Sequence, residues 1–403
     1  GLPGAVPYGP MNTYDVIIAG CGPAGATAGY LLAREGHSTA MIDRAIFPRP
    51  KLCGGLLPLK TLGLLERVFG DTPETLTENG IITCTSSGYR IFFREELLVR
   101  GTTDLPFSFI ERETYDHYLL AKARSQGARI FEGEEVTGVD ADAGEIRTSS
   151  GRICHGRFIL GADGVYSAVR RCLPATGKDT RAGAHGLAAA LEVFVPRTGL
   201  SLHVDHPMIH LGYVDWGYAW VFPNRDRIIV GLGGLQRRNT KKFIDILQEY
   251  LAGLGILPPR DGMGRLAVHG HSIPYGGMVM RPVHKHVLLV GDAAGLADPI
   301  TGEGIYYAHR SAEAAAVSIT TALRRGLSLE KVYQGLLNRH VLPELLWAWR
   351  WRTVVFNALG YLPPALIGRL VRWGNTRALH VIHGHRPYPF DRGGQGMYGK
   401  IQE

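Results

Sequence analysis

Three glycines at close spacing, Gly20, Gly22 and Gly25, could bind the phosphates of a nucleotide. They follow a short apolar run at residues 15–19 and precede alanines and leucines at helical spacing, which predicts a strand, a turn and a helix. Gly20 would allow the tight turn, Gly22 would let backbone approach a pyrophosphate, and Gly25 would let the helix lie against the strand. The N-terminus of that helix would then face the anion.

Asp43 completes this unit at the end of a second predicted strand, residues 39–42. A carboxylate there can accept hydrogen bonds from the ribose hydroxyls of an adenosine. Strand, helix, second strand and acid together predict a bound dinucleotide, and a plain glycine-rich turn is the alternative.

Two further acids follow apolar runs. Asp163 precedes Gly164, a pair that is also typical of a simple turn. Asp292 follows a buried run and stands shortly before Gly302 and Gly304, where a helix over 305–323 is predicted. Asp292 could accept a ribityl hydroxyl, and the glycines could offer backbone N–H groups to an electron-rich ring.

A cysteine and an arginine lie near these motifs in the sequence. Cys53 stands in a proline- and glycine-rich loop, where a buried inert thiol and a functional thiol are both open. Arg112 begins a helix predicted to end near residue 126, and it could reach a phosphate or lie on the surface. Because the helix dipole disfavours a cation there, we favour the phosphate.

Strand-like runs dominate residues 186–280, which predicts an antiparallel sheet inserted into the nucleotide-binding part. Tyr218, Trp220 and Phe222 alternate with smaller residues and so share one face of a strand. They form either a core strand or one wall of an apolar pocket. Earlier in the chain, residues 80–91 predict paired strands with a turn at 86–88.

Composition excludes several classes of function. The chain has 403 residues, a formal charge of +8 and scattered basic residues, which argues against nucleic acid and favours an acidic substrate or an anionic membrane surface. Its five cysteines show no metal-binding spacing, so we expect reduced thiols, no metal and a cytoplasmic protein without a secretory signal. No apolar run reaches the roughly 20 residues of a spanning helix.

Tryptophans and arginines alternate in residues 347–373. Such a segment suits a bilayer interface, which predicts peripheral membrane contact, and helices packed on the substrate domain are the equal alternative.

These motifs together resemble the FAD-binding superfamily that includes the aromatic hydroxylases. Within it, the segment KLCGG at 51–55 and the segment YAWVFP at 218–223 resemble the geranylgeranyl reductase family. The resemblance implies a flavoprotein that saturates C=C bonds of polyprenyl chains in diphosphates, prenylated lipids, chlorophyll or quinone tails. It implies that Tyr218, Trp220 and Phe222 line the prenyl channel. The implied FAD contacts are Gly20, Gly22, Ala24, Gly25, Asp43, Arg44, Cys53, Gly54, Arg112, Val136, Asp163, Asp292, Gly302, Gly304 and Ile305.

An isolated alkene offers no carbonyl to polarise, so its reduction needs a strong hydride donor, a dry pocket and a proton source. Flavin would supply the hydride, and Cys53 is a candidate for gating or protonating. Leu56 replaces a third consecutive glycine found in some relatives. Because no second dinucleotide fingerprint is present, the electrons would come from transiently bound NADPH or NADH, or from a protein such as ferredoxin.

Three other functions share this fold: an aromatic hydroxylase, a flavin-dependent halogenase and an electron relay to quinone at a membrane. Halogenases typically carry WxWxIP, from which residues 218–223 depart at the first and fifth positions.

The expected fold is α/β, with a Rossmann-type FAD-binding domain, an inserted antiparallel substrate sheet and a C-terminal helical region. The FAD-binding domain would comprise residues 11–84, 109–183 and 281–325. Residues 85–108 and 184–280 would form the substrate domain, and residues 326–403 the helical region.

Overall fold

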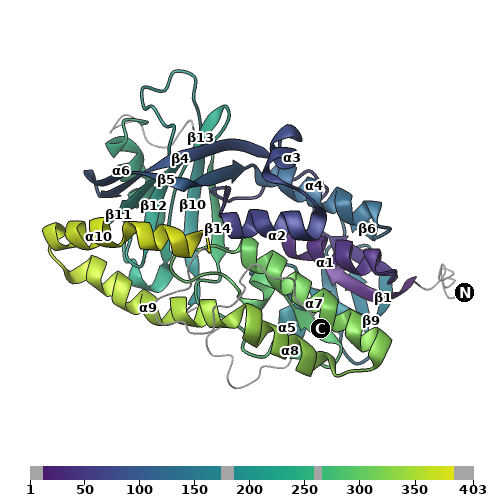
Figure 1. Cartoon of the computed structure of the whole chain (residues 1–403). Coiled ribbons are helices and arrows are strands. Elements are labelled where there is room, and N and C mark those ends of the chain that lie inside the picture. The colour runs from purple at the N-terminus through teal and green to yellow at the C-terminus, as the bar shows by residue number, and fades with distance from the viewer. Residues whose placement is uncertain (1–11, 174–185, 258–265, 385–403) are drawn as a thin grey trace, which may run out of the picture.

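Two eight-stranded sheets organise the chain in a computed structural model that describes residues 12–173, 186–257 and 266–384 (Figure 1). The first sheet contains β1 (Asn12–Ala19), β2 (Thr39–Asp43), β6 (Arg129–Glu132), β7 (Val136–Asp140), β8 (Glu145–Thr148), β9 (Ile153–Gly161), β15 (Val283–His284) and β16 (Val287–Leu289). The second contains β3 (Leu56–Leu57), β4 (Ile82–Phe93), β5 (Glu96–Ile110), β10 (Ala188–Pro196), β11 (Met208–Leu211), β12 (Gly217–Pro223), β13 (Arg227–Leu235) and β14 (Val268–Ile273).

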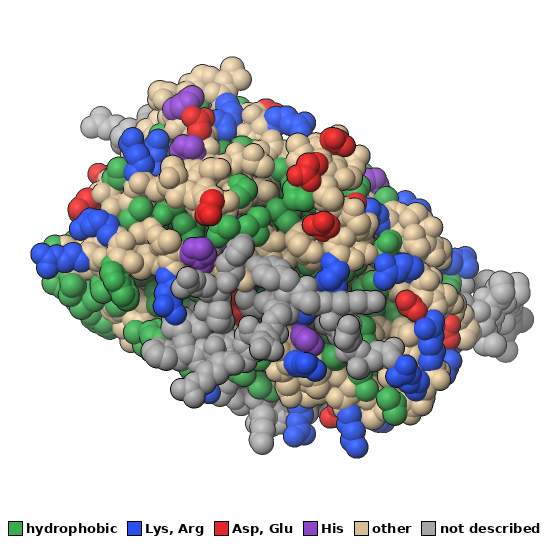
Figure 2. All heavy atoms as spheres, in the orientation of Figure 1, with side chains coloured by type: hydrophobic (Ala, Val, Ile, Leu, Met, Phe, Trp, Pro, Cys, Tyr) green, Lys and Arg blue, Asp and Glu red, His purple; other side chains and the backbone are tan. Residues whose placement is uncertain are grey.

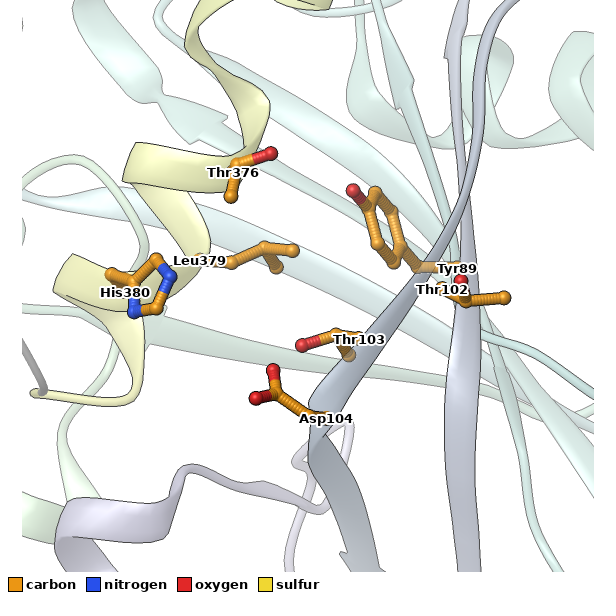
Figure 3. A pocket seen from close by; sticks show the side chains of 7 residues that line it. All are labelled: Tyr89, Thr102, Thr103, Asp104, Thr376, Leu379 and His380. Carbon is orange, nitrogen blue, oxygen red and sulfur yellow. The ribbon is translucent and has the colours of Figure 1, made fainter.

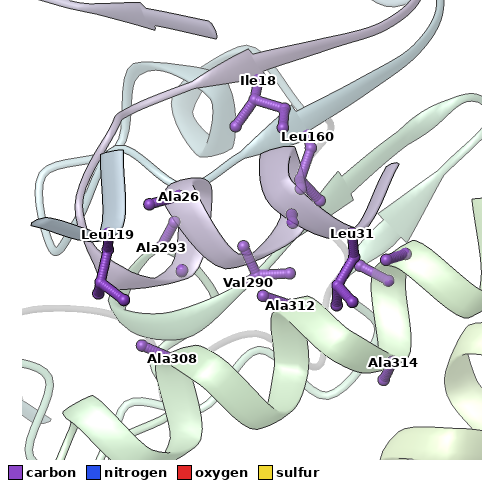
Figure 4. Packing of buried hydrophobic residues seen from close by; sticks show 14 of the residues in the cluster. Ile18, Ala26, Leu31, Leu119, Leu160, Val290, Ala293, Ala308, Ala312 and Ala314 are labelled. Atoms are coloured by element: carbon purple, nitrogen blue, oxygen red, sulfur yellow. The ribbon is translucent and has the colours of Figure 1, made fainter. Parts of the chain in front are cut away.

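The first sheet is the predicted nucleotide-binding unit. Its central strand β1 runs parallel to β2 and to β9, and β9 runs parallel to β16. Helix α1 (Pro23–Arg34) connects β1 to β2 and packs against α7 (Ile305–Arg325). The Thr27 hydroxyl on α1 lies 2.6 Å from His309 Nδ1 on α7. Alanines of both helices, among them Ala26, Ala308 and Ala312, belong to the buried core of this unit (Figure 4). The carboxyl ends of the parallel strands are thereby held beside the start of α1.

The second sheet is antiparallel except where β11 runs parallel to β4. One of its faces is covered by α6 (Phe243–Gly253), whose Leu247 packs with Val221 and Val230. The other face carries an aromatic cluster that includes Trp220 and Phe222. This division follows from the alternation of side chains along β12.

The turn predicted at residues 86–88 is wrong, because β4 runs unbroken through it. The chain reverses at Arg94, whose φ is 52°, and β5 begins just beyond. Gly88 instead marks a shift in register between β4 and β5, where the His206 ring packs so closely that a Cβ would lie 2.6 Å from it. The glycine therefore accommodates a neighbouring ring within a strand.

Helices cover the first sheet and one edge of the second (Figure 1). Their C-terminal set docks on both, since Tyr89 on β4 donates a hydrogen bond to Asn375 at 2.6 Å, and the Tyr333 hydroxyl donates to the Leu289 carbonyl oxygen of β16 at 2.8 Å. The remaining helices are α2 (Leu59–Phe69), α3 (Pro73–Glu78), α4 (Arg112–Ser125), α5 (Ala168–Cys172), α8 (Leu329–His340), α9 (Leu342–Tyr361) and α10 (Pro364–Ile382), with short 3₁₀ turns η2 (Gln236–Arg238) and η3 (Gly291–Ala294).

The predicted fold class is therefore confirmed: a Rossmann-type unit, a second largely antiparallel sheet and C-terminal helices. The division into domains stays a prediction, and its limits at 11, 183–184 and 403 lie outside the described residues. Among the helices of the described ranges, none has the length and apolar character needed to cross a membrane.

Candidate functional site

The glycine turn after β1 has no room for side chains. Gly20 adopts a φ of 99°, and a Cβ there would lie 2.3 Å from the Ala162 carbonyl oxygen. A Cβ on Gly25 would lie 1.9 Å from the Gly20 carbonyl oxygen. Gly22 caps α1, and no side chain accepts a hydrogen bond from the first turn of that helix. The first N–H groups of α1 are thus available to an anion.

Asp43 lies beside this turn at the end of β2. Its Oδ2 accepts the Cys21 backbone N–H at 2.7 Å, and its Oδ1 accepts the Ala45 N–H at 2.9 Å. The neighbouring Arg44 side chain is exposed, and Ala24 is buried in α1. Asp43 is therefore held by the same backbone that would meet a ribose.

Arg49 joins the turn from the loop after β2, which the sequence analysis did not anticipate. Its Nη2 lies 3.1 Å from Asp116 and would lie 3.7 Å from a Cβ on Gly22. Its Nη1 is buried and has no hydrogen-bond partner in the described structure. An uncommitted cationic N–H at the mouth of α1 fits a pyrophosphate. The only sequence signal was an arginine between two prolines, which gives no hint of its contact with α4.

Arg112 occupies the same cluster. Its Nε and Nη2 bind both oxygens of Asp116, at 2.7 and 2.8 Å. Although burial alone would lower the pKa of Arg112, the Asp116 carboxylate raises it overall. Asp116 is fully buried and serves two guanidinium groups, so the cluster keeps a net positive charge.

Two other predicted cofactor residues contact the first sheet. Asp163 caps α5, because its carboxylate accepts hydrogen bonds from the Ser167 hydroxyl and the Ala168 backbone N–H. A Cβ placed on Gly20 would lie 2.9 Å from the Asp163 Cα. Val136 begins β7 and packs against the core of the first sheet. The structure thus gives Asp163 a role in shaping the glycine turn, and its predicted FAD contact stays a prediction.

Asp292 lies beside the glycines that precede α7, and its predicted contact with FAD stays a prediction. A Cβ on Gly304 would lie 3.3 Å from Asp292 Oδ1, and Gly304 caps α7 without a side-chain hydrogen bond. Burial raises the pKa of Asp292, while Lys51, Arg112 and Arg170 oppose this shift. Gly302 adopts a φ of 74° in the same loop, and Ile305 begins the helix buried. The strand end and the helix start therefore form one site.

The loop at residues 51–55 joins this site to the second sheet. Lys51 Nζ lies 2.5 Å from His271 Nε2, and burial, helped by Arg112, lowers the Lys51 pKa to about 8. A Cβ on Gly54 would lie 2.8 Å from the Phe222 ring and 3.5 Å from Trp220 Nε1. The Cys53 sulfur accepts the Gly55 N–H at 3.4 Å, and burial raises the pKa of its thiol, which is therefore neutral at pH 7.

The strand register places the predicted substrate residues on the face that this loop covers. Gly231 and Gly233 on β13 leave space that the aromatic rings of β12 occupy, so a Cβ on Gly231 would lie 2.5 Å from Trp220. The Tyr218 hydroxyl donates to the Thr301 carbonyl oxygen, which ties this face to the loop before α7. Residues paired across neighbouring strands of the second sheet form three rows on this face. The rows are His271, Ala190, Gly233 and Tyr218; His269, Glu192, Gly231 and Trp220; and Phe194, Ile229 and Phe222.

Glu192 is an acid within this apolar face that the sequence analysis missed. Its side chain has 0% exposure, and neither carboxyl oxygen has a hydrogen-bond partner among the described residues. Burial raises its pKa to about 8. The Cys53 backbone, the Trp220 indole and the charges of Lys51 and Arg112 oppose this increase. A single acid inside an apolar strand was the available signal.

An open cavity of about 370 Å³ lies where α10 meets β4 and β5 (Figure 3). Tyr89 and Leu379 line it and also belong to the aromatic cluster that contains Trp220. Its other lining residues are Thr102, Thr103, Asp104, Thr376 and His380. Among the described residues that line this cavity, none is a lysine or an arginine.

Within the described ranges, no group of three His, Cys, Asp or Glu side chains is placed to bind a metal ion. The donor set instead fits a dinucleotide: a glycine cradle, the uncommitted Arg49 and a second glycine-rich helix start beside Asp292.

Comparison with known proteins also indicates a dinucleotide-binding protein. The family described as FAD binding domain matches residues 13–211. An uncharacterized protein of Methanosarcina barkeri is 31% identical over 83% of this chain and 82% of its own length. The geranylgeranyl diphosphate reductase of Rhodobacter capsulatus is 29% identical over 81% of both chains. A geranylgeranyl bacteriochlorophyll reductase-like structure from Thermoplasma acidophilum covers 90% of this chain and 91% of its own, with a TM-score of 0.75 at 23% identity.

Replacing Arg49 with methionine should weaken FAD binding roughly ten- to a hundredfold, because a charge-assisted hydrogen bond contributes about 1.5–3 kcal/mol. Titration of the apoprotein with FAD, followed by flavin fluorescence, measures the change in Kd. Arg157→Met, which removes an exposed arginine of the same sheet, is the matched control and should leave the Kd unchanged. Equal affinity of Arg49→Met and the wild type would remove Arg49 from the phosphate site.

Proposed function

The chain belongs to the geranylgeranyl reductase family of FAD-dependent oxidoreductases, and on this premise we propose that it saturates C=C bonds of a polyprenyl chain. One observation carries the proposal: the Tyr218, Trp220 and Phe222 face lies directly beneath the loop that joins it to the FAD-binding sheet. Because an isolated alkene lacks a polar handle, an apolar wall next to the cofactor is the recognition element that it requires.

The chain carries an FAD-binding domain, and its residues suggest how FAD would be held. Gly20, Gly22 and Arg49 would bind the pyrophosphate, and Asp43 the adenosine ribose. Asp292 and the backbone before α7 would bind the other half of the cofactor. Reduced FAD supplies a hydride donor when bound, and the protein supplies position, dryness and a proton.

The aromatic cluster would exclude water from the reacting bond. Trp220 and Phe222 are each 7% exposed, and Phe109 and Phe107 pack with them. The cavity between α10 and β5 borders this cluster, so we propose that the polar end of the substrate lies there while the chain runs toward Trp220 (Figure 3). Its described rim of threonines, Asp104 and His380, without lysine or arginine, favours an uncharged head group over a diphosphate.

The electron donor would be external. The sequence contains one dinucleotide fingerprint, so NADPH, NADH or a ferredoxin-like protein would bind transiently to reduce the flavin.

The α9 and α10 hairpin offers a surface for membrane contact, where such a substrate would be found. Its exposed large apolar side chains are Val354, Tyr361, Leu366, Leu370 and Trp373, and hydrophobic atoms gather at this end of the molecule (Figure 2). The first part of segment 347–373 has another role, because Arg352 is buried and donates to the Tyr275 carbonyl oxygen at 2.7 Å. We therefore confine the proposed membrane contact to the end of the hairpin.

The reductase proposal predicts that anaerobic dithionite-reduced enzyme transfers electrons to a prenyl substrate. Mixing with geranylgeranyl diphosphate or a geranylgeranylated lipid should reoxidise the flavin and add two hydrogens to the product per flavin. Absorbance and product mass spectrometry report the two events. A flavin that stays reduced with every prenyl substrate, but reacts with a quinone or with oxygen and a phenol, would assign the protein to a relay or a hydroxylase.

The membrane proposal predicts that the double variant Tyr361→Glu with Trp373→Glu binds anionic phospholipid vesicles at least tenfold more weakly, because two large apolar groups no longer enter the interface. Vesicle co-sedimentation of the FAD-loaded protein measures the bound fraction. Leu327→Glu places one such carboxylate at an exposed apolar site outside the hairpin, and it should bind like the wild type. Undiminished binding of the double variant would contradict membrane contact through this hairpin.

A further inference from the structure

Glu192 is an acid in a place where acids are costly. It lies on β10 inside the second sheet, fully buried, and neither of its oxygens has a hydrogen-bond partner among the described residues. A buried polar group without a partner destabilises the fold, and an unpaired buried charge does so more strongly. Its position therefore calls for a functional explanation.

The surroundings of Glu192 are those of the proposed substrate wall. Gly231 on β13 is paired with Glu192 on one neighbouring strand and with Trp220 on the other. A Cβ on Gly231 would lie 2.7 Å from Glu192 Cγ and 2.5 Å from the Trp220 ring. The carboxyl group and the indole therefore share the space above one glycine. The loop containing Cys53 and Gly54 lies over the same face.

The nearby cations are committed to other partners. Arg112 binds both oxygens of Asp116, and the Lys51 ammonium lies against His271. His269, opposite Glu192 on β14, is exposed and packs against Phe194. Within the described part of the chain, no ion pair therefore holds Glu192 ionised. Burial raises its pKa to about 8, so that the neutral acid predominates at pH 7.

Other acidic protons on this face are less available. The Tyr218 hydroxyl is donated to the Thr301 carbonyl oxygen. Burial raises the pKa of the Cys53 thiol above its usual value of 9.0, which makes it the weaker acid.

We propose that Glu192 is the catalytic acid that protonates the double bond of the substrate. This inference rests on the proposed reductase function. One alkene carbon gains a hydride, so that reduced flavin is oxidised by two electrons, and the other carbon takes the proton as the Glu192 O–H bond breaks. A solvent proton then restores the carboxyl group, and the external nicotinamide or protein donor restores the flavin.

The test compares Glu192→Gln with Cys53→Ser, and with Glu249→Gln as a control that removes an exposed carboxylate of the same sheet domain. Infrared difference spectroscopy of the resting protein should show the C=O stretch of a protonated carboxyl group that disappears on titration through pH 8 and is missing in Glu192→Gln. This readout does not depend on turnover.

In the anaerobic reoxidation assay, Glu192→Gln should bind FAD normally and reduce the alkene at least a hundredfold more slowly, the usual contribution of general acid catalysis. The wild-type rate should fall as the pH rises through the Glu192 pKa, because the carboxylate has no proton to give, and Glu192→Gln should lose that dependence. Glu192→Asp should recover part of the rate if it keeps the infrared band. Glu249→Gln should match the wild type, and Cys53→Ser should keep the wild-type dependence of the rate on pH.

A Glu192→Gln rate within threefold of the wild type would overturn the proton-donor role while leaving the reductase function intact. A hundredfold loss in Cys53→Ser alone would transfer the role to the thiol. A wild-type enzyme that reduces no prenyl substrate would overturn the proposed function, and the role of Glu192 in it, even if the infrared band titrates as expected.

Discussion

The loop between β2 and β3 is fastened to both sheets, and the arrangement of the candidate site depends on this double attachment. On the side of the first sheet, the Phe47 N–H donates to Glu132 at 2.8 Å. On the side of the second, the Gly55 carbonyl oxygen accepts the Ile110 N–H at 2.8 Å, and a Cβ on Gly55 would lie 2.2 Å from the Ile110 carbonyl oxygen. The loop therefore brings a cation to the phosphate end and the Gly54 backbone against the aromatic face.

Charge changes along the site in a way that matches the two molecules it would hold. Near the glycine turn, two arginines share the single carboxylate of Asp116, which leaves a positive charge for phosphates. Near Trp220, the surroundings are apolar, and Glu192 is more stable as a neutral acid. Burial has opposite effects at the two ends, because it strengthens the attraction for an anion at one and suppresses ionisation at the other.

Sequence patterns predicted those parts of the site that depend only on residues close together in the chain. The β1, α1 and β2 unit and the alternation of Tyr218, Trp220 and Phe222 depend on neighbours in the chain, so periodicity and glycine spacing were sufficient. Arg49 and Glu192 were not predicted, because sequence spacing does not encode the contacts that define their roles. Arg49 depends on Asp116 in α4, and Glu192 depends on the register between β10 and β13. Gly88 was misread as a turn for the same reason, since the ring that requires it belongs to His206.

The proposed function requires that the polyprenyl chain lies on the aromatic face of the second sheet, beside the cofactor. A crystal structure of the FAD-loaded protein with a long prenyl alcohol tests it most directly. We expect the chain to run along Tyr218, Trp220 and Phe222, with a double bond in contact with the Glu192 carboxyl group. A chain bound on another surface, with the Trp220 face still closed by the loop at residues 51–55, would contradict it.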